Sequence, residues 1–238
     1  MPDALPFLIA CLAAYLIGSI PFGYLIGKAH GIDIRAKGSG NIGATNLGRI
    51  VGKFWGKLCF LLDLGKGAGP VIAYGAYAGV LGNLDTFRGL PPKPEDQPGS
   101  WALLFWITVG MAAILGHIFP LYLRFRGGKG VATGFGVMLG MWPQLTAPAF
   151  AALFVWYVTL KLTRYVGIAS CAAAVSLPFW YILWRIPRSA DSFSNVLKEV
   201  GVGWPIIAAT ILLALLVIYK HRGNIQRVLA GTEPKIGE

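Results

Sequence analysis

The sequence predicts an all-α protein that crosses the membrane with seven helices. The composition is 55% apolar and only 13% charged, with a mean hydropathy of +0.62, whereas soluble domains carry roughly a quarter charged residues. Apolar runs fill most of the 238 residues, and about 20 apolar residues are enough to cross the hydrocarbon core as a helix. The charges are unequal, with 21 Lys and Arg against 10 Asp and Glu.

This composition excludes several classes of protein. A net charge of +11 is typical of proteins that bind nucleic acid or an anionic membrane surface, but a soluble nucleic-acid binder has no use for so many apolar side chains. The 32 glycines do not indicate disorder or collagen, because apolar runs surround them. Cys11, Cys59 and Cys171 lie inside apolar runs without CxxC spacing, so we expect buried thiols and neither a disulfide framework nor a zinc site.

The apolar runs divide into seven spans within one integral-membrane domain, residues 1–238. The first run is broken only by Pro21, and its start, Met1-Pro2-Asp3, lacks the basic residues of a signal peptide, so we expect it to be retained. The long run 131–160 exceeds one span and is divided at Pro143. The predicted spans are 5–27, 58–81, 101–123, 131–142, 144–160, 165–184 and 202–219.

The distribution of charge predicts the orientation. If the N-terminus is outside, fifteen Lys and Arg and three acids fall on one side, and five basic residues and six acids on the other. Basic residues stay on the cytoplasmic side during insertion, so we expect the N-terminus outside and the C-terminus in the cytoplasm. A single tilted helix over 131–160 would reverse everything after it, but Lys161, Arg164 and the basic tail favour two crossings. Residues 83–100, with four prolines, are then an extracytoplasmic linker.

The first polar cluster, residues 37–49, reads KGSGNIGATNLGR. Glycines let a backbone turn its amides toward an anion, and the cluster adds neutral polar side chains and two cations. A flexible connector between spans is the alternative, but connectors rarely combine four glycines, two Asn and an Arg within twelve residues. We therefore expect a ligand-binding loop.

The second and third clusters carry six more of the Lys and Arg residues that this orientation places in the cytoplasm. Residues 124–133, RFRGGKGVAT, place a glycine-rich turn before a helix, where free amides and the helix dipole suit a phosphate; a basic stop signal explains Arg124 and Arg126 but not the glycines. Residues 220–233, KHRGNIQRVLAGTE, are equally compatible with a ligand site and with an ordinary basic tail.

Three ionisable residues lie within or near the spans. Asp63 and Lys66 are three apart, so they can pair on one helix face, and the pair either serves function or only holds the helix in place. His117, near Pro120, is either a site residue or a packing residue. Under the predicted orientation the three clusters share one face, which favours a small anionic, phosphorylated ligand with an apolar part between helices.

The sequence also indicates the kind of reaction. It contains neither a GxSxG nucleophile elbow nor an HxxxxD pair, so catalysis would depend on positioning and charge stabilisation. Such catalysis requires a substrate that is already activated, and an acyl group in a mixed anhydride with phosphate is activated in this way. A transporter of a phosphorylated metabolite would also explain Asp63 and Lys66. Transporters, however, bind substrate near the middle of the membrane, whereas the three clusters are expected on one face. A third alternative is a basic scaffold that binds nucleic acid, but the loops of this sequence contain no aromatic platform on which bases could stack.

The motifs resemble one known family. The runs GSGNIGATNLGR (38–49), GHIFPLYLRFRGGKGVAT (116–133) and HRGNIQRVLAGTE (221–233), with DLGKG at 63–67, are similar to the signatures of the bacterial acyl-phosphate-dependent glycerol-3-phosphate acyltransferases. The resemblance implies a seven-helix enzyme of the bacterial inner membrane with its active site facing the cytoplasm. It implies transfer from acyl phosphate to position 1 of glycerol 3-phosphate, giving lysophosphatidic acid and phosphate, without an acyl-enzyme, metal or other cofactor. Its partners would be these two substrates and membrane lipid, and not nucleic acid.

The resemblance also implies roles for individual residues. Ser39, Lys129 and His221 would be catalytic, and the loop of Gly127, Gly128 and Gly130 would hold a phosphate through backbone amides. The other implied residues bind substrate or shape its site: Asn41, Gly43, Thr45, Asn46, Arg49, Lys66, His117, Asn224, Arg227 and Glu233. The proton of the attacking hydroxyl would go to His221 or to the departing phosphate. The one departure, the long loop at 83–100, lies away from the motifs.

Overall fold

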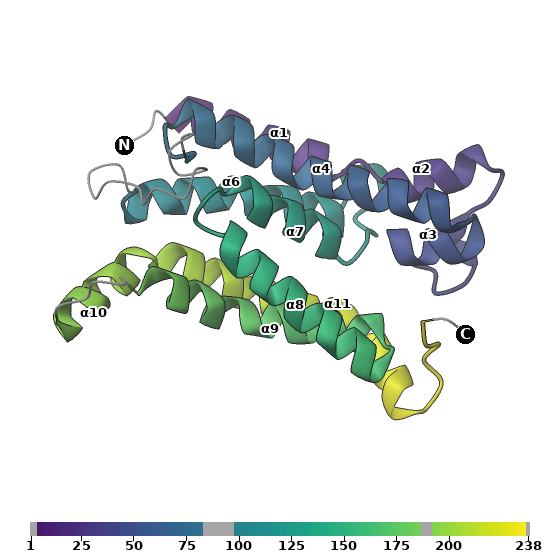
Figure 1. Ribbon diagram of the computed structural model, residues 1–238. Coiled ribbons are helices and arrows are strands. Elements are labelled where there is room, and N and C mark those ends of the chain that lie inside the picture. Colours follow the sequence, from purple (N-terminus) through teal and green to yellow (C-terminus); the bar gives the residue numbers. More distant parts are fainter. Residues whose placement is uncertain (1–3, 83–97, 187–191, 237–238) are drawn as a thin grey trace. The chain divides into compact units, whose positions relative to one another are not determined.

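The computed structural model describes residues 4–82, 98–186 and 192–236, and every regular element in these ranges is a helix (Figure 1). The Pro-rich loop predicted at 83–100 therefore lies almost wholly outside the described residues. The helices are α1 (Ala4–Gly18), α2 (Phe22–Ala29), η1 (Ile34–Ala36), α3 (Ala44–Ile50), α4 (Lys53–Tyr77), α6 (Ser100–Ile118), η3 (Leu121–Leu123), α7 (Val131–Gly140), α8 (Thr146–Thr163), α9 (Val166–Arg185), α10 (Phe193–Val202) and α11 (Trp204–Leu229).

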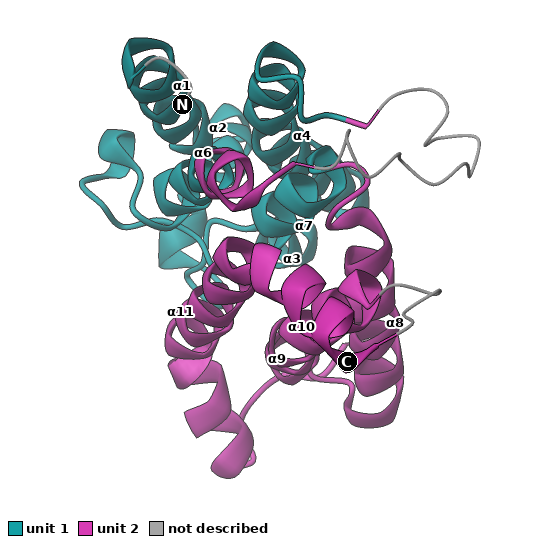
Figure 2. Ribbon diagram, turned by 90° about the vertical axis from the view of Figure 1, so that its left-hand side faces the viewer, with its two compact units in different colours: residues 1–81, 108–141 teal, residues 82–107, 142–238 magenta. Residues whose placement is uncertain are grey.

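The chain divides into two compact units (Figure 2). Unit 1 comprises residues 1–81 and 108–141, and unit 2 comprises residues 82–107 and 142–238. Helix α6 starts in unit 2 and ends in unit 1. The expected single domain stays a prediction, and each unit is described by itself below.

The first predicted span covers both α1 and α2, and each of the others overlaps one long helix or α7. Among the described residues, five segments are long and apolar enough to cross a membrane. These are Ala4–Ala29, Ser100–Leu123, Thr146–Thr163, Val166–Arg185 and Trp204–Leu229. Helix α7 is apolar but shorter, and α4 carries the charged residues of the predicted second span. The prediction of an all-helical protein with several apolar helices is confirmed, whereas the count of seven crossings and the orientation stay predictions.

The helix ends differ from the sequence prediction in several places. The chain leaves helical structure around Pro143, between α7 and α8, where two spans were predicted, and around Pro21, between α1 and α2, where the sequence indicated a break inside one span. Helix α4 begins at Lys53, before residue 58, and α11 continues to Leu229, beyond residue 219. Hydropathy marks where a helix leaves the apolar layer, not where its backbone hydrogen bonds end. Helix α11 ends instead where Gly231 takes a positive φ of 70°, as is common after a helix C-terminus.

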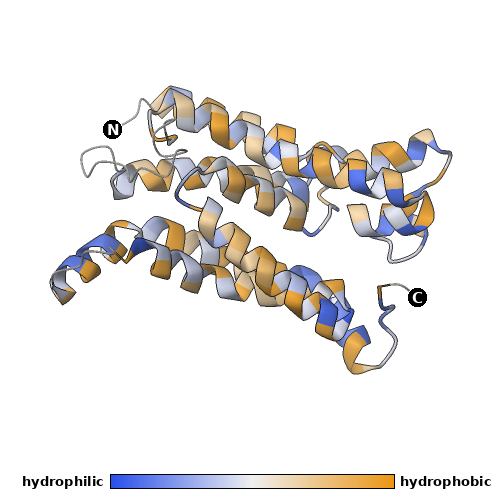
Figure 3. Ribbon diagram, in the orientation of Figure 1, coloured by the Kyte–Doolittle hydropathy of each residue, from blue (hydrophilic) through white to orange (hydrophobic). Residues whose placement is uncertain are grey.

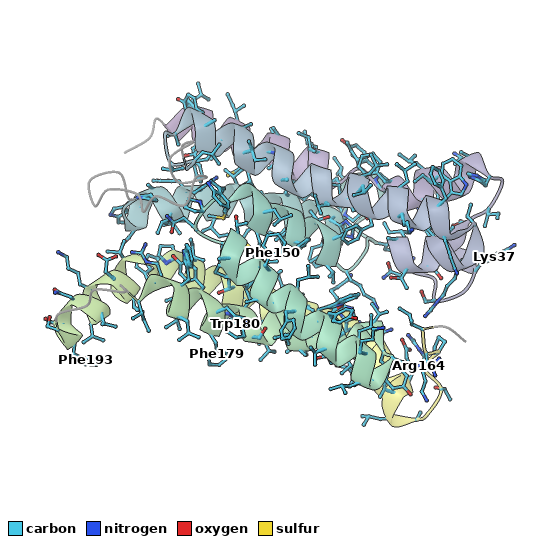
Figure 4. The ribbon with its side chains drawn as sticks, viewed as in Figure 1. Lys37, Phe150, Arg164, Phe179, Trp180 and Phe193 are labelled. Atoms are coloured by element: carbon cyan, nitrogen blue, oxygen red, sulfur yellow. The ribbon has the colours of Figure 1, made fainter. Side chains whose placement is uncertain are left out.

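Two short helices were not expected from the sequence. Helix α3 lies inside the predicted ligand loop, and α10 lies between α9 and α11 with the Ser192 side chain accepting a hydrogen bond from the Asn195 amide. Hydrophilic residues gather around α2 and α3 in unit 1 and around the C-terminal part of α11 in unit 2 (Figure 3). Large apolar side chains elsewhere are exposed, such as Phe150 and Phe179 in unit 2, at 56% and 65% (Figure 4). Such exposure is expected of helices that face lipid.

In unit 1, helices α4 and α7 approach closely because glycines lie at their contact. A Cβ on Gly67 would lie 2.2 Å from the Thr133 carbonyl oxygen, and one on Gly136 would lie 2.0 Å from the Leu64 carbonyl oxygen. Small residues at such contacts let membrane helices pack backbone to backbone. This packing brings Thr133 on α7 next to the charged residues of α4.

A buried ion pair lies at the centre of unit 1. Lys66 Nζ is 2.8 Å from Asp63 Oδ1, one helical turn away, and both side chains are almost fully buried. The same ammonium donates a hydrogen bond to the Ile20 carbonyl at 2.7 Å and lies 5.5 Å from the centre of the Phe22 ring. The predicted pairing is confirmed, and Lys66 also satisfies a carbonyl at the break between α1 and α2.

Asp63 extends this cluster toward α6 and α7. His117 Nδ1 lies 3.6 Å from Asp63 Oδ1 and is hydrogen-bonded to the Thr133 hydroxyl at 3.0 Å. Cys59 donates a weak hydrogen bond from its thiol to Asp63 Oδ2 at 3.6 Å. The buried charge cluster, by which we mean Asp63, Lys66, His117 and Thr133, thus connects α4 to the C-terminal end of α6 and the first turn of α7.

We predict that Gly67→Ala destabilises the protein, by about 1–3 kcal/mol if the cost is that of overpacking a filled core. The added methyl group would meet the backbone of α7, which cannot move aside as a side chain can. Gly69→Ala is the matched control on the same helix, because a Cβ there meets nothing within 4 Å. Thermal unfolding of the purified proteins in detergent measures the difference, and equal melting temperatures for the two variants would contradict the packing described here.

We predict that Asp63→Asn costs about 3–5 kcal/mol, the usual penalty for removing one partner of a buried ion pair. The substitution leaves the Lys66 ammonium buried without a counter-charge. Asp33→Asn is the control, because Asp33 pairs with Arg35 at 2.7 Å with both side chains close to half exposed, and exposed pairs contribute little. The apparent melting temperature should fall for the first variant only. A similar, small change in both would show that the buried pair is dispensable.

Candidate active site

The first loop in unit 1 is built around Asn46, which is 2% exposed. Its amide nitrogen donates hydrogen bonds to the carbonyls of Ile34, Lys37 and Asn41 at 3.1, 3.2 and 2.9 Å, and its Oδ1 accepts from the Ser39 amide at 2.9 Å. Gly38 and Gly40 have positive φ values of 57° and 69°, which L-residues with side chains rarely adopt. The loop therefore needs both the Asn and these glycines at their positions.

Asn41 shapes the other end of this loop. Its Oδ1 accepts a hydrogen bond from the Gly43 amide at 2.8 Å, a turn that leads directly into α3. Thr45 and Arg49 are exposed on α3, and Ser39 is exposed in the loop itself. Within the described ranges, no hydrogen bond or ion pair engages the side chains of these three residues. The scaffold thus leaves them available to a ligand.

The loop keeps a positive charge because its one neighbouring acid is already paired. Asp33 is the only acid among residues 28–57. Its carboxylate accepts hydrogen bonds from the Arg35 guanidinium and the Arg35 amide, and these bonds lower the pKa of Asp33 from 3.8 to about 2. Neither Lys37, labelled in Figure 4, nor Arg49 forms an ion pair with any described residue. The loop suits an anionic ligand.

The glycines of the second cluster pack against α6. The Gly127 amide donates to the Ile118 carbonyl at 3.2 Å and the Gly128 amide to the His117 carbonyl at 3.1 Å. A Cβ on Gly127 would lie 2.2 Å from the His117 carbonyl oxygen, and one on Gly128 would lie 2.2 Å from His117 Nε2. In this structure these two amides serve the fold, so the phosphate role predicted for them stays a prediction that requires their bonds to open.

The start of α7 offers other donors. Gly130 precedes the helix with a positive φ of 77°, and Lys129 stands beside it, partly buried. Within the part of the chain that the structure describes, no carbonyl accepts from the amides of Val131 and Ala132. These first-turn amides lie at the positive end of the helix dipole. An anion at this position would also be near the Lys129 backbone.

Lys66 and His117, which the resemblance implies as substrate-binding residues, belong to the buried charge cluster. Both are at most 6% exposed, and both have partners inside unit 1. His117 also contributes the carbonyl that accepts from Gly128. Their contacts favour a supporting role beneath the glycine loop, although direct contact with substrate stays untested.

The third cluster lies in unit 2, and most of it is on the part of α11 that continues beyond the predicted span 202–219. His221 is 2% exposed, and its Nδ1 donates to the Val217 carbonyl at 2.8 Å. Because a carbonyl only accepts, this bond makes Nε2 the basic nitrogen of the neutral ring. One turn further on, Asn224 faces the same side, and Gly167 of α9 leaves room for both side chains.

Glu233 orders the polar residues at the end of α11. Its Oε1 accepts from the Asn224 amide nitrogen, and its Oε2 accepts from Arg227 Nε at 2.6 Å. Its side chain is only 8% exposed. The contacts agree with a structural role for Glu233 in this cluster.

The structure sorts the predicted site residues by unit. Unit 1 holds Ser39, Asn41, Gly43, Thr45, Asn46, Arg49, Lys66, His117, Gly127, Gly128, Lys129 and Gly130, and unit 2 holds His221, Asn224, Arg227 and Glu233. Sequence reasoning left Asp63 and Thr133 out of the site, although the spacing of Asp63 and Lys66 pointed to a pair. No sequence signal indicates that Thr133 meets His117, because that contact depends on how α4, α6 and α7 pack.

Comparisons with known proteins agree with these motifs. The family model for glycerol-3-phosphate acyltransferase matches residues 8–231. A glycerol-3-phosphate acyltransferase of Thermosynechococcus vestitus is 40% identical over 228 residues, covering 95% of this chain and 93% of the relative. One of Pseudomonas syringae pv. tomato is 40% identical over 222 residues, covering 92% and 93%.

A solved structure shares the fold as well. The crystal structure of PlsY, an integral membrane glycerol 3-phosphate acyltransferase, in its glycerol 3-phosphate form is 33% identical with a TM-score of 0.75, covering 98% of this chain and 96% of that chain. Its lysophosphatidic acid form has a TM-score of 0.72 at the same identity and coverage. The chain therefore belongs to the glycerol-3-phosphate acyltransferase family of integral membrane enzymes.

Proposed function

We propose that the chain transfers an acyl group from acyl phosphate to the 1-hydroxyl of glycerol 3-phosphate, producing lysophosphatidic acid and inorganic phosphate for phospholipid synthesis. The observation that carries the proposal is the first loop, whose buried Asn46 holds the backbone while Ser39, Thr45 and Arg49 remain available. A cationic loop with neutral hydroxyl groups suits a phosphorylated polyol such as glycerol 3-phosphate.

The acyl donor must bring its own activation. The proposed mechanism is direct attack, in which the 1-hydroxyl oxygen forms an ester bond with the acyl carbonyl carbon and the bond from that carbon to the phosphate oxygen breaks. Lys129 and the amides at the start of α7 stabilise the departing phosphate. The hydroxyl proton passes to His221 Nε2 or to the phosphate. No acyl-enzyme forms in this scheme.

The remaining residues have supporting roles in the proposal. Ser39, Arg49 and Asn224 contact glycerol 3-phosphate or the reacting centre. Asn41, Gly43 and Asn46 hold the first loop, as their hydrogen bonds support. Arg227 and Glu233 hold the third cluster, as theirs support.

We also propose that the chain crosses the bacterial inner membrane seven times, with the N-terminus outside and the C-terminus in the cytoplasm. The proposal is supported by the excess of Lys and Arg in the connections that it places in the cytoplasm, since basic residues are retained on that side. It places all three clusters on the cytoplasmic side, where soluble glycerol 3-phosphate is available.

The proposed reaction predicts that the purified protein in detergent releases inorganic phosphate from acyl phosphate only when glycerol 3-phosphate is present. One lysophosphatidic acid should form for each phosphate released, because both come from the same bond exchange. A colorimetric phosphate assay, with mass spectrometry of the lipid, measures both products. Phosphate release that does not depend on glycerol 3-phosphate would overturn the proposal. So would acylation that occurs only from a thioester or an ester and not from acyl phosphate.

We predict that Lys129→Ala lowers kcat by roughly 100-fold or more, because one lost charge-stabilising contact in the transition state costs about 2.7–4 kcal/mol. Lys28→Ala is the control, since Lys28 is an exposed cation at the end of α2 and has no part in the proposed mechanism. Steady-state kinetics on both purified variants tests the prediction. Near-normal activity of the Lys129 variant would remove this residue from the mechanism.

A further inference from the structure

We propose that Arg164, at the turn between α8 and α9, is a positioning residue for acyl transfer. It holds the C-terminal segment, residues 232–236, so that Glu233 orients Asn224 and Arg227. The inference rests on the proposed function, because it takes Asn224 to serve the reaction. In the sequence analysis Arg164 counted only as one of the cytoplasmic charges, and it lies outside all three motifs.

Arg164 and Ile236 are joined by hydrogen bonds in both directions. The Arg164 guanidinium donates to the Ile236 carbonyl from Nε at 3.3 Å and from Nη2 at 3.0 Å. The Ile236 amide donates to the Arg164 carbonyl at 2.9 Å. Arg164 follows the end of α8 with a positive φ of 63°, which turns its backbone carbonyl and its side chain toward the same segment. Figure 4 labels Arg164 near the C-terminal segment of unit 2.

The segment held in this way carries Glu233. After Gly231 the amides of Thr232 and Glu233 both donate to the Arg227 carbonyl, at 2.8 and 3.2 Å, so the chain folds back along the end of α11. The Glu233 carboxylate then reaches Asn224 and Arg227. Lys235 adds a contact with the same turn, since its Nζ lies 5.9 Å from the centre of the Tyr165 ring.

The carboxylate of Glu233 decides which way the Asn224 amide points. An ionised carboxylate only accepts hydrogen bonds, so it selects the NH₂ end of the amide and turns the carbonyl oxygen of Asn224 to the opposite side. In the proposed function, this orientation of the amide is the one that Asn224 presents to the substrate. Without the hydrogen bonds between Arg164 and Ile236, the segment would no longer hold Glu233 against Asn224, and the amide would be able to rotate.

A double-mutant cycle tests whether Arg164 acts through Glu233. We expect Arg164→Ala and Glu233→Ala each to lower kcat about tenfold or more, the size of a lost charge-assisted hydrogen bond, with Arg164→Ala the milder of the two. We call the hydrogen bonds between Arg164 and Ile236 the clasp. The double variant should be no slower than Glu233→Ala alone, because without the Glu233 carboxylate the clasp has nothing left to position. Ile236→Pro, which removes the amide that donates to the Arg164 carbonyl, should lower kcat in the same direction.

The control is Lys161→Ala on the same turn of unit 2. Lys161 is exposed, and its Nζ lies 5.5 Å from the centre of the Tyr157 ring on its own helix. It should keep wild-type kcat and the same melting temperature in detergent as Arg164→Ala. Equal melting temperatures separate positioning from loss of fold, and if Arg164→Ala does not fold, Ile236→Pro at the end of the chain decides the question.

Two results would overturn the inference. Effects of Arg164→Ala and Glu233→Ala that multiply in the double variant would show that Arg164 acts by another route. Wild-type kcat in Arg164→Ala or in Ile236→Pro would show that the clasp is not needed. Failure of the proposed function is a separate outcome, since it would appear as a wild-type protein without glycerol 3-phosphate-dependent release of phosphate.

Discussion

The ion pair of Asp63 and Lys66 is the interaction on which unit 1 depends. A charge inside an apolar helix layer is costly unless a partner and further hydrogen bonds compensate it, and here each charge also serves another element. Lys66 satisfies the Ile20 carbonyl where α1 breaks before Pro21, and Asp63 lies against His117 at the end of α6. Two irregular points of unit 1, the α1–α2 break and the glycine loop after α6, are thus tied to one buried pair on α4.

The glycines at 127–130 suit two different roles, which are binding of an anion and close packing against a helix. A glycine is needed wherever a backbone must approach closely, whether the approaching group is a ligand or another helix. Sequence reasoning assigned Gly127 and Gly128 to a phosphate, but the structure places the end of α6 against both Cα atoms. The His117 ring occupies the space that a side chain at 128 would need. The phosphate role of Gly127 and Gly128 stays a prediction, and the first-turn amides of Val131 and Ala132, next to Lys129, are the donors that we propose for an anion at this loop.

Local rules predicted the features that depend on near neighbours in sequence. Pro21 and Pro143 end helices because proline lacks an amide donor, and the spacing of Asp63 and Lys66 places both on one face. Composition and charge pointed to the three clusters, and the family resemblance supplied the roles of their residues. Three features could not be predicted in this way. The contact of Thr133 with His117 and the hydrogen bonds of Arg164 to Ile236 depend on packing between residues 16 and 72 positions apart. The length of α11 depends on the end of the helix beyond the apolar run.

Both parts of the candidate site are built on the same division of labour. A buried residue with several hydrogen bonds holds the backbone or a neighbouring side chain, namely Asn46 in unit 1 and Glu233 in unit 2. In the described part of unit 1, the side chains of Ser39 and Arg49, which are proposed to contact substrate, form no hydrogen bond or ion pair that holds the loop. Because holding and binding fall on different side chains, a change at Asn46 or Glu233 should alter turnover through geometry, whereas a change at Arg49 should alter substrate binding and leave the fold intact. The site can therefore vary its ligand contacts without losing its scaffold.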